Sequence, residues 1–191
     1  KIKLSAIVAP TMLWLPVINL FLALINAYSA KKVEFKARLS EIKRGCSLVW
    51  LPGGFEDVVN MEESSDTVTV PKGWVKYALQ AGCRVVPTYH LGEHQTYFII
   101  PLPFRSWRRT ISKRYQFPCL IPWFWGQSGS PVPNFNPPIV TLIGSPICFP
   151  TITNPTNAQI SKWHRIYCKE LLALVNRYKD TINPSIQLTI L

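Results

Sequence analysis

The order of elements near the middle of the chain constrains the fold most. Residues 47–51 are apolar and favour a buried strand, and Pro52-Gly53-Gly54 then requires a tight turn. Residues 71–80 favour a helix that Gly82 ends, and residues 85–89 favour a second buried strand. Strand, helix and strand in this order predict an α/β fold with a parallel sheet.

The remaining sequence adds further elements to this unit, and we expect residues 1–191 to form a single domain. Residues 139–143 favour a third strand, whereas residues 60–69 favour an acidic loop. Residues 101–138 are rich in proline and predict little regular structure. Two more helices are predicted: residues 31–44, with apolar positions Val33, Ala37, Leu39 and Ile42, and residues 158–178, with Ile160, His164, Tyr167, Leu171, Leu174 and Val175 near one face.

The segment from residue 4 to residue 30 holds no charged side chain. Its length suits a membrane span, but its prolines and asparagines argue against a simple one. We therefore favour a buried helix and strand that also contact the membrane interface, with a true span as the alternative. Lysines on both sides could anchor either arrangement at lipid headgroups: Lys1, Lys3, Lys31 and Lys32.

Composition points to apolar and anionic partners. Hydrophobic residues make up 48% of the chain and charged ones 16%, and seven are Trp. A bilayer surface, an acyl-chain groove or a large core would each account for this excess. Lys and Arg number 21 against 10 acids, and no carboxylate lies between His94 and Lys169, which favours lipid headgroups, carrier phosphates or nucleic acid. The five cysteines lack metal or redox spacing, which favours reduced thiols.

Three short motifs are candidates for a site. The Gly53-Gly54 turn follows a predicted strand, and ligands gather at the carboxyl ends of strands in open α/β sheets. Glu56 and Asp57 would there orient a base or hold a hydroxyl, although a simple turn with solvated acids has the same sequence. Lys72-Gly73 begins the next helix and suits an anion, and Gly92-Glu93 follows the second strand, where Glu93 is a site residue or the partner of an arginine.

Other patterns predict less. His90 and His94 have the spacing of helical metal ligands, but Gly92 lies between them, so we predict no metal site. Residues 126–130 lack the second glycine of a serine nucleophile elbow and favour a loop. Basic and aromatic residues mix between 105 and 114, which fits membrane docking, and no nucleic-acid recognition motif accompanies them.

The motifs of the central unit resemble the diacylglycerol acyltransferase type 2 family, which also holds monoacylglycerol and wax-ester acyltransferases. The resemblance rests on Leu51-Pro52-Gly53-Gly54-Phe55-Glu56-Asp57, on residues 72–82, on Val86-Pro87-Thr88-Tyr89 and on Gly92-Glu93 through Tyr97. Downstream it continues through Trp125-Gly126-Gln127, residues 138–147, and Pro155-Thr156 with His164 and Tyr167. It covers nearly the whole chain.

This resemblance implies a glycerolipid-acyltransferase-like sheet with flanking helices. It implies transfer of a fatty acyl group from acyl-CoA, a co-substrate rather than a cofactor, to the hydroxyl of an acylglycerol, with diacylglycerol giving triacylglycerol. The implied partners are membrane lipids, acyl-CoA and the acylglycerol, without nucleic acid, at the endoplasmic reticulum membrane or a lipid droplet. The family's general base lies in a His-Pro-His-Gly motif, which this sequence lacks and which we expect upstream of Lys1. We therefore expect these 191 residues to be inactive alone.

The resemblance also implies roles for individual residues. Asp57 and Glu93 support catalysis, and the substrate-binding residues are Gly53, Gly54, Glu56, Lys72, Gly73 and Gly92. We expect the glycine turn and Glu93 to lie side by side. Two departures from the family pattern are Asp57, where glutamate is common, and His94, where asparagine is common. Two alternatives stay open: a lipid-binding homologue without catalysis, and a basic nucleic-acid-binding module.

Overall fold

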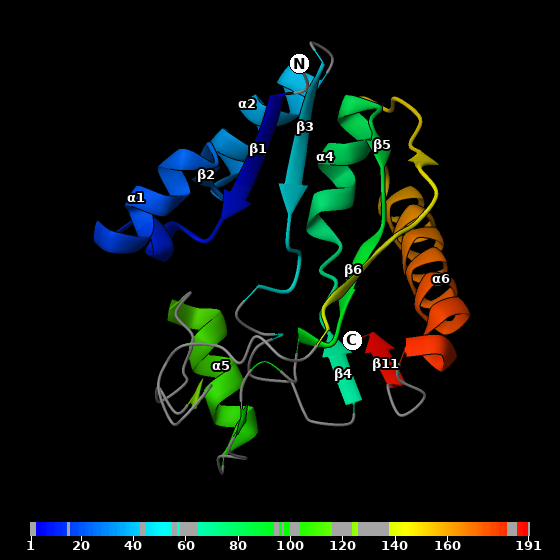
Figure 1. Cartoon of the computed structure of the whole chain (residues 1–191). Coiled ribbons are helices and arrows are strands. Elements are labelled where there is room, and N and C mark those ends of the chain that lie inside the picture. Colours follow the sequence, from blue (N-terminus) through cyan, green and yellow to red (C-terminus); the bar gives the residue numbers. More distant parts are fainter. Residues whose placement is uncertain are drawn as a thin grey trace. The chain divides into compact units, whose positions relative to one another are not determined.

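The computed structural model describes residues 3–14, 16–42, 45–54, 57, 65–93, 96, 98–99, 104–115, 124–125, 138–182 and 187–190. Helices and strands are mixed, as expected for an α/β protein (Figure 1). The chain divides into two compact units. The first comprises Lys1–Gly54, Pro71–Val85 and Cys148–Trp163, and the second comprises Phe55–Val70, Val86–Ile147 and His164–Leu191.

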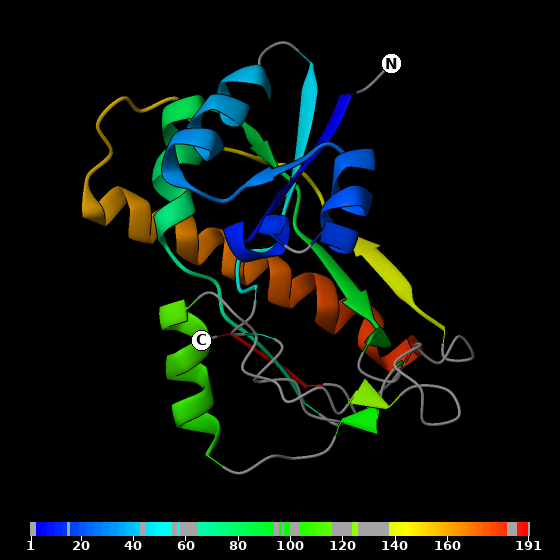
Figure 2. The ribbon, with the colours of Figure 1, turned by 90° about the vertical axis from the view of Figure 1, so that its left-hand side faces the viewer.

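A three-stranded parallel sheet forms the base of the first unit. Its order is β2-β1-β3, with β1 (Lys3–Val8) between β2 (Ala27–Ser29) and β3 (Cys46–Trp50). Ala6 of β1 pairs with Ala27 on one side and Val49 on the other, and Figure 2 shows β1 and β3 running in the same direction. The predicted strand at 47–51 is thus confirmed, but it lies at the end of the sheet order, and its residues alternate between partly buried and exposed.

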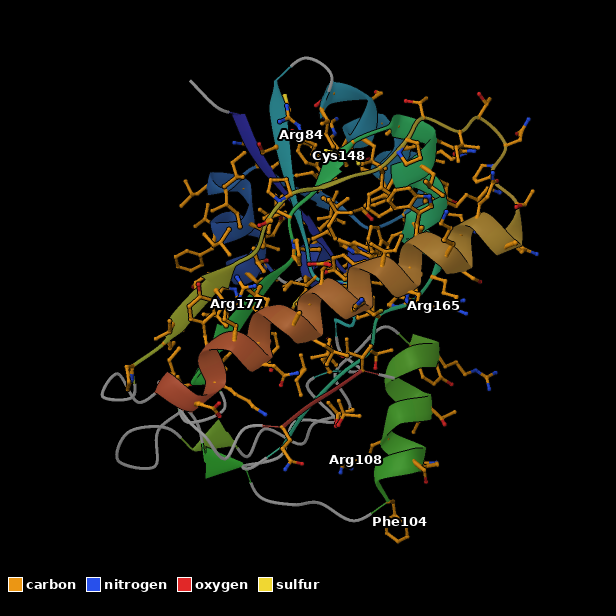
Figure 3. All side chains as sticks on the ribbon, turned by 90° about the vertical axis from the view of Figure 1, so that its right-hand side faces the viewer. Arg84, Phe104, Arg108, Cys148, Arg165 and Arg177 are labelled. Atoms are coloured by element: carbon orange, nitrogen blue, oxygen red, sulfur yellow. The ribbon has the colours of Figure 1, made fainter. Side chains whose placement is uncertain are left out.

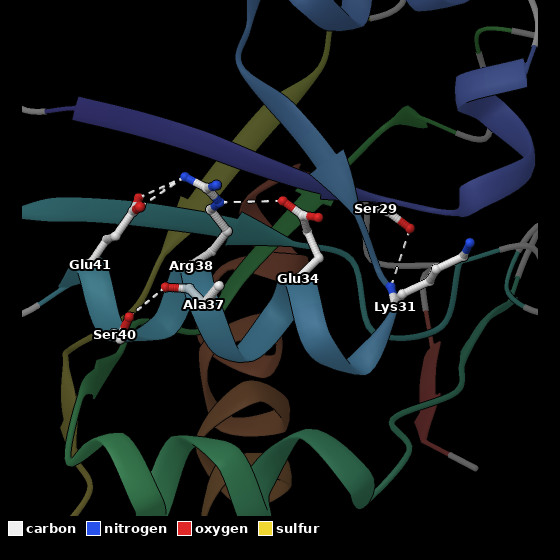
Figure 4. Close-up of polar contacts among 7 residues, drawn as sticks. All are labelled: Ser29, Lys31, Glu34, Ala37, Arg38, Ser40 and Glu41. Atoms are coloured by element: carbon white, nitrogen blue, oxygen red, sulfur yellow. Dashed lines mark hydrogen bonds and ion pairs between the residues drawn. The ribbon is translucent and has the colours of Figure 1, made fainter.

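Helix α2 (Lys32–Glu41) confirms the helix predicted at 31–44. Its buried side chains are Phe35 and Leu39, whereas the predicted core residue Val33 is exposed. Arg38 lies between two carboxylates, with Nε 3.6 Å from Glu34 and Nη1 2.9 Å from Glu41 (Figure 4). The Arg38 guanidinium also lies 3.9 Å from the centre of the Tyr28 ring in β2, which ties the helix to the sheet.

Helix α4 (Gly73–Ala81) confirms the second predicted helix, and Gly82 ends it in the left-handed conformation with φ of 62°. A continuous series of aromatic contacts joins α4 to its neighbours. Trp74 lies 5.6 Å from Trp50 of β3 and 5.9 Å from Phe149, between ring centres. On one side, Phe35 contacts Trp50, and the rings of Phe35 and Tyr77 lie 5.8 Å apart. On the other side, the rings of Phe149 and Trp163 lie 5.0 Å apart. Part of the aromatic excess therefore packs inside the first unit.

The apolar segment at 4–30 folds differently from the favoured prediction. After β1 it forms the 3-10 helix η1 (Pro10–Trp14) and helix α1 (Pro16–Leu24). Instead of a buried helix, α1 presents large apolar side chains to solvent, and Leu24 is 75% exposed. The helix has nine residues, and no helix in the described part of the chain combines the length and apolarity needed to cross a bilayer.

The second unit holds an antiparallel pair, whereas the strand predicted at 85–89 was expected to join a parallel sheet with the strand at 47–51. Strand β6 (Thr88–Leu91) pairs with β9 (Val140–Ile143), the strand predicted at 139–143. The strand predicted at 85–89 is split, because Pro87 has no amide hydrogen to donate to a ladder. Its first part is β5 (Arg84–Val85), which pairs with β10 (Ile147–Cys148). A buried apolar cluster joins this pair to the last helix of the chain. It consists of Leu91 of β6, Leu142 of β9 and Leu174 of that helix.

Helix α6 (Asn157–Ile182) confirms the final predicted helix, with Tyr167, Leu171, Leu174 and Val175 buried. It begins with a reciprocal cap. Gln159 donates its backbone N–H to Thr156 Oγ1 at 3.3 Å, and its side-chain oxygen accepts from the Thr156 backbone N–H at 2.8 Å.

Several elements have no counterpart in the sequence predictions. Strand β4 (Ser65–Val68) lies in the predicted acidic loop and pairs in parallel with β11 (Gln187–Ile190). Helix α5 (Arg105–Tyr115) lies in the proline-rich region that was expected to be irregular. Strand β8 (Phe124–Trp125) of the same region forms a short antiparallel pair with β7 (Phe98–Ile99), which precedes the region.

Candidate functional site

The Gly53-Gly54 turn directly follows β3, at the carboxyl end of a strand in the parallel sheet. Gly54 has φ of 53°, a conformation that favours glycine. A Cβ added at Gly54 would meet no atom of the described residues within 4 Å. The glycine therefore provides the backbone angle that the turn requires, and no described residue fills the space beside it.

Lys72 and Gly73 begin α4 in the same unit. Lys72 is exposed, and no side-chain hydrogen bond caps the helix at this residue. A Cβ added at Gly73 would also meet no described atom within 4 Å. Because the first N–H groups of a helix have no acceptor within the helix, this end with its lysine suits an anionic group.

Asp57 has a hydrogen-bonding role that the sequence did not indicate. Its Oδ1 accepts a 2.6 Å hydrogen bond from the backbone N–H of Thr69, and the Asp57 side chain is half-buried. The next residue, Val70, accepts a 2.7 Å hydrogen bond from Nε2 of His164. Two consecutive backbone groups shortly before α4 are thus held by side chains from distant parts of the second unit. The carbonyl can only accept, so Nε2 of His164 carries a proton.

Gly92 and Glu93 follow β6. Gly92 has φ of 89°, and a Cβ there would collide with the carbonyl oxygen of Pro138. Only glycine therefore allows these two backbone segments to approach so closely. Glu93 is exposed, and its backbone oxygen accepts hydrogen bonds from Thr96, at 2.7 Å from Oγ1 and 3.1 Å from N. Within the described residues, no lysine or arginine forms an ion pair with the Glu93 carboxylate.

The two described histidines take part in structural hydrogen bonds. Nδ1 of His90 lies 3.0 Å from Oγ1 of Thr141, across the β6–β9 pair, and His164 binds Val70 as above. His94 and the serine motif at 126–130 lie outside the described residues. The part of the chain that the structure describes holds no group of three or more side chains able to bind a metal ion.

Tyr167 of α6 is a buried titratable group of the second unit. Burial, with a smaller contribution from Cys168, raises the pKa of Tyr167 to about 12. This residue and His164 lie on the inward side of α6, as the sequence predicted. Their burial and hydrogen bonding indicate that both stabilise the fold.

The predicted site residues divide between the two units. Gly53, Gly54, Lys72 and Gly73 belong to the first, and Asp57, Gly92 and Glu93 belong to the second. Glu56 lies outside the described residues. The expected proximity of the glycine turn and Glu93 stays a prediction.

Comparison with known proteins identifies the family. The family profile described as diacylglycerol acyltransferase matches residues 1–190. The chain belongs to this family. A relative from Xenopus tropicalis, diacylglycerol O-acyltransferase 2, is 36% identical over 154 residues, which cover 75% of this chain and 42% of the relative.

Two mammalian relatives give a similar result. The human diacylglycerol O-acyltransferase 2 is 30% identical over 151 residues, covering 74% of this chain and 39% of its own length. The bovine diacylglycerol O-acyltransferase 2-like protein 6 is 26% identical over 179 residues, covering 87% of this chain and 53% of its own length. The chain thus spans about half or less of the curated relatives it matches. No solved structure matches it.

Proposed function

We propose that the protein containing this chain transfers a fatty acyl group from acyl-CoA to the hydroxyl of diacylglycerol and so forms triacylglycerol. The match of the family profile over residues 1–190 carries this proposal, supported by relatives named diacylglycerol O-acyltransferase 2. These names favour an enzyme over the lipid-binding homologue without catalysis.

In the proposed reaction the acceptor hydroxyl oxygen attacks the thioester carbonyl carbon. The new C–O bond forms as the C–S bond breaks, and the hydroxyl proton passes to a general base and then to the CoA sulfur. The family resemblance assigns that base to a histidine outside these 191 residues. The residues of this chain would bind and orient the substrates.

Four of the predicted site residues have a stated role in this proposal. Glu93, exposed after β6, orients the base or the acceptor hydroxyl. Gly54 leaves space beside its backbone for substrate, and Lys72 with the open start of α4 binds phosphates of CoA. Asp57 acts by positioning, because its carboxylate already holds the backbone of Thr69.

We further propose that the protein works at the endoplasmic reticulum membrane or a lipid droplet surface. The support lies in η1 and α1, where Trp14 is 79% exposed and Leu20, Phe21 and Leu24 are each more than half exposed. Residues 4–30 hold no charge that would oppose insertion into an apolar phase. In this proposal α1 lies in the interface and does not cross the bilayer.

The test is an acyl-transfer assay on the full-length gene product in membranes that lack other neutral-lipid acyltransferases. Labelled acyl-CoA is supplied with diacylglycerol, monoacylglycerol or a long-chain alcohol in separate reactions. We expect labelled triacylglycerol as the main product. Lipid binding without any labelled ester would contradict the proposal and favour the inactive homologue, and a wax ester alone would reassign the acceptor.

A further inference from the structure

His164 links helix α6 to the chain just before α4. The residue is half-buried, and its Nε2 donates a 2.7 Å hydrogen bond to the backbone oxygen of Val70. Sγ of Cys168, one helical turn later, lies 3.7 Å from Nε2 and 3.8 Å from Nδ1 of the same ring. Helix α6 is a continuous coil of 26 residues, drawn in gold to red in Figure 3, and it is packed through buried side chains such as Tyr167. The imidazole therefore holds the Val70 carbonyl from a well-anchored element.

The short chain between Val70 and α4 transmits this restraint, because few of its torsions are free. The Val70 oxygen lies in the peptide plane that ends at Pro71, so a hydrogen bond to this oxygen orients the proline as well. The proline ring fixes its own φ and restricts Val70 to extended conformations. Lys72 follows with φ of −69° and ψ of −18°, and its carbonyl accepts a 3.2 Å hydrogen bond from the N–H of Val75. The orientation of the Val70 carbonyl thus constrains the direction in which α4 begins.

Burial changes abruptly along this segment. Val70 is 2% exposed, whereas Pro71, Lys72 and Gly73 are exposed. A buried carbonyl requires a donor, which His164 provides. No side-chain hydrogen bond caps the exposed start of α4. The covalent chain therefore carries to this start an order that the hydrogen bond creates at Val70.

We propose that His164 is a positioning residue for the acyl donor. Through the Val70 carbonyl it holds Lys72 and the first N–H groups of α4, where the phosphates of CoA bind. This inference rests on the proposed function, in which Lys72 and the start of α4 bind those phosphates. The imidazole itself touches no substrate. Without its hydrogen bond, the start of α4 samples several orientations, and binding of the phosphates has to restore the productive one at a cost in affinity.

The variants H164Q and H164M form a matched pair, because their side chains have similar lengths and only glutamine carries an N–H donor. The test measures the affinity of the purified full-length protein for oleoyl-CoA and for oleoyl-pantetheine, which has the same thioester but no phosphate. We expect H164M to bind oleoyl-CoA on the order of tenfold more weakly and oleoyl-pantetheine as the unmodified protein does. H164Q should stay within about threefold of the unmodified protein for both ligands. In the transfer assay, H164M should raise KM for oleoyl-CoA by the same factor and leave kcat unchanged.

Two controls separate positioning from general stability. Q159A removes the cap at the start of α6, so it should lower the free energy of unfolding without changing the affinity for either ligand. K72M removes the lysine itself. The double variant H164M/K72M should bind oleoyl-CoA less than about threefold more weakly than K72M, since both substitutions act on one site.

A further variant approaches the same link from the other side. P71A frees the torsion of residue 71 and leaves His164 in place, so it should also weaken binding of oleoyl-CoA and not of oleoyl-pantetheine. Pro71 is exposed, so this substitution removes no core packing. P71A carries the test where circular dichroism shows that H164M is unfolded.

Three results would overturn the proposal. They are equal affinities of H164M and H164Q for oleoyl-CoA, an equal loss of both thioesters in H164M, and an unmodified protein that binds the two thioesters equally well. Because these measurements record binding, they do not depend on acyl transfer. A protein that shows the expected binding differences but forms no triacylglycerol would contradict the proposed reaction and leave the role of His164 standing.

Discussion

At the scale of residues, two hydrogen bonds fix the position of the backbone shortly before α4. Asp57 holds the N–H of Thr69, and His164 holds the carbonyl of Val70. The sequence marked both side chains, Asp57 for catalysis and His164 for the core. It could not show that they act on neighbouring backbone groups, because the contacts span 12 and 94 residues of sequence.

Substitution of Asp57 separates its two roles. Asp57→Ala removes the acceptor for the Thr69 N–H and should lower the free energy of unfolding by about 1–3 kcal/mol. Asp57→Asn keeps an oxygen that can accept this bond, so its unfolding free energy should change less. Denaturant unfolding of both variants provides the measurement. Equal losses in the two variants would show that the carboxylate charge, and not the hydrogen bond, stabilises the fold.

Tyr167 predicts an alkaline loss of stability. Burial raises its pKa in the folded protein to about 12, above the value near 10 of an unfolded chain, so the folded state holds the proton more tightly. Its contribution is complete below pH 10 and is lost as the pH rises to 12, by up to about 3 kcal/mol. Tyr167→Phe should therefore lose less stability than the unmodified protein over this interval.

The exposed Tyr178 provides the control for this measurement. Tyr178→Phe should follow the unmodified protein from pH 10 to 12 in denaturant unfolding. If Tyr167→Phe shows the same alkaline slope as Tyr178→Phe, burial of Tyr167 does not hold its proton.

At the scale of elements, local sequence signals predicted α2, α4, α6, β3 and β9 well. Each has its apolar pattern and its end signals within its own segment, such as Gly82 after α4 and the Thr156–Gln159 cap of α6. The missed strands depend on distant partners, since β4 pairs with β11 more than a hundred residues later. Helix α5 was missed because proline is frequent on both sides of it and Phe104 begins it in an unusual conformation.

Substitution of two glycines tests how closely the backbone packs at Gly92. Gly92→Ala forces a Cβ against the Pro138 carbonyl at a positive φ and should destabilise the protein by about 1–3 kcal/mol. The Cβ of Gly73→Ala meets no described atom within 4 Å, and the residue lies in helix α4, where alanine is favoured over glycine by up to about 1 kcal/mol. Thermal unfolding distinguishes the two. A Gly92→Ala variant as stable as Gly73→Ala would contradict the close approach of these segments.

At the scale of the whole molecule, the apolar and basic excess divides among several places. An aromatic series fills the first unit, α1 exposes aliphatic side chains, and α5 combines exposed aromatics with positive charge. Composition indicated an excess of apolar residues but left a large core and a bilayer surface as alternative explanations. In the structure, some of these apolar side chains are buried and others are exposed. The candidate site could be proposed from the sequence for two reasons. Its motifs resemble those of the family, and several of its glycines and acids come directly after predicted strands.

The most direct test of the account is acyl transfer by the full-length protein with and without the Glu93 carboxylate. We expect labelled triacylglycerol from acyl-CoA and diacylglycerol with the unmodified protein, and a rate at least about 100-fold lower with Glu93→Gln. Glu170→Gln, which removes an exposed carboxylate from α6, should leave the rate unchanged. No labelled neutral lipid from the unmodified protein with any acylglycerol or long-chain alcohol would contradict the central claim, and equal rates for the two variants would remove Glu93 from the site.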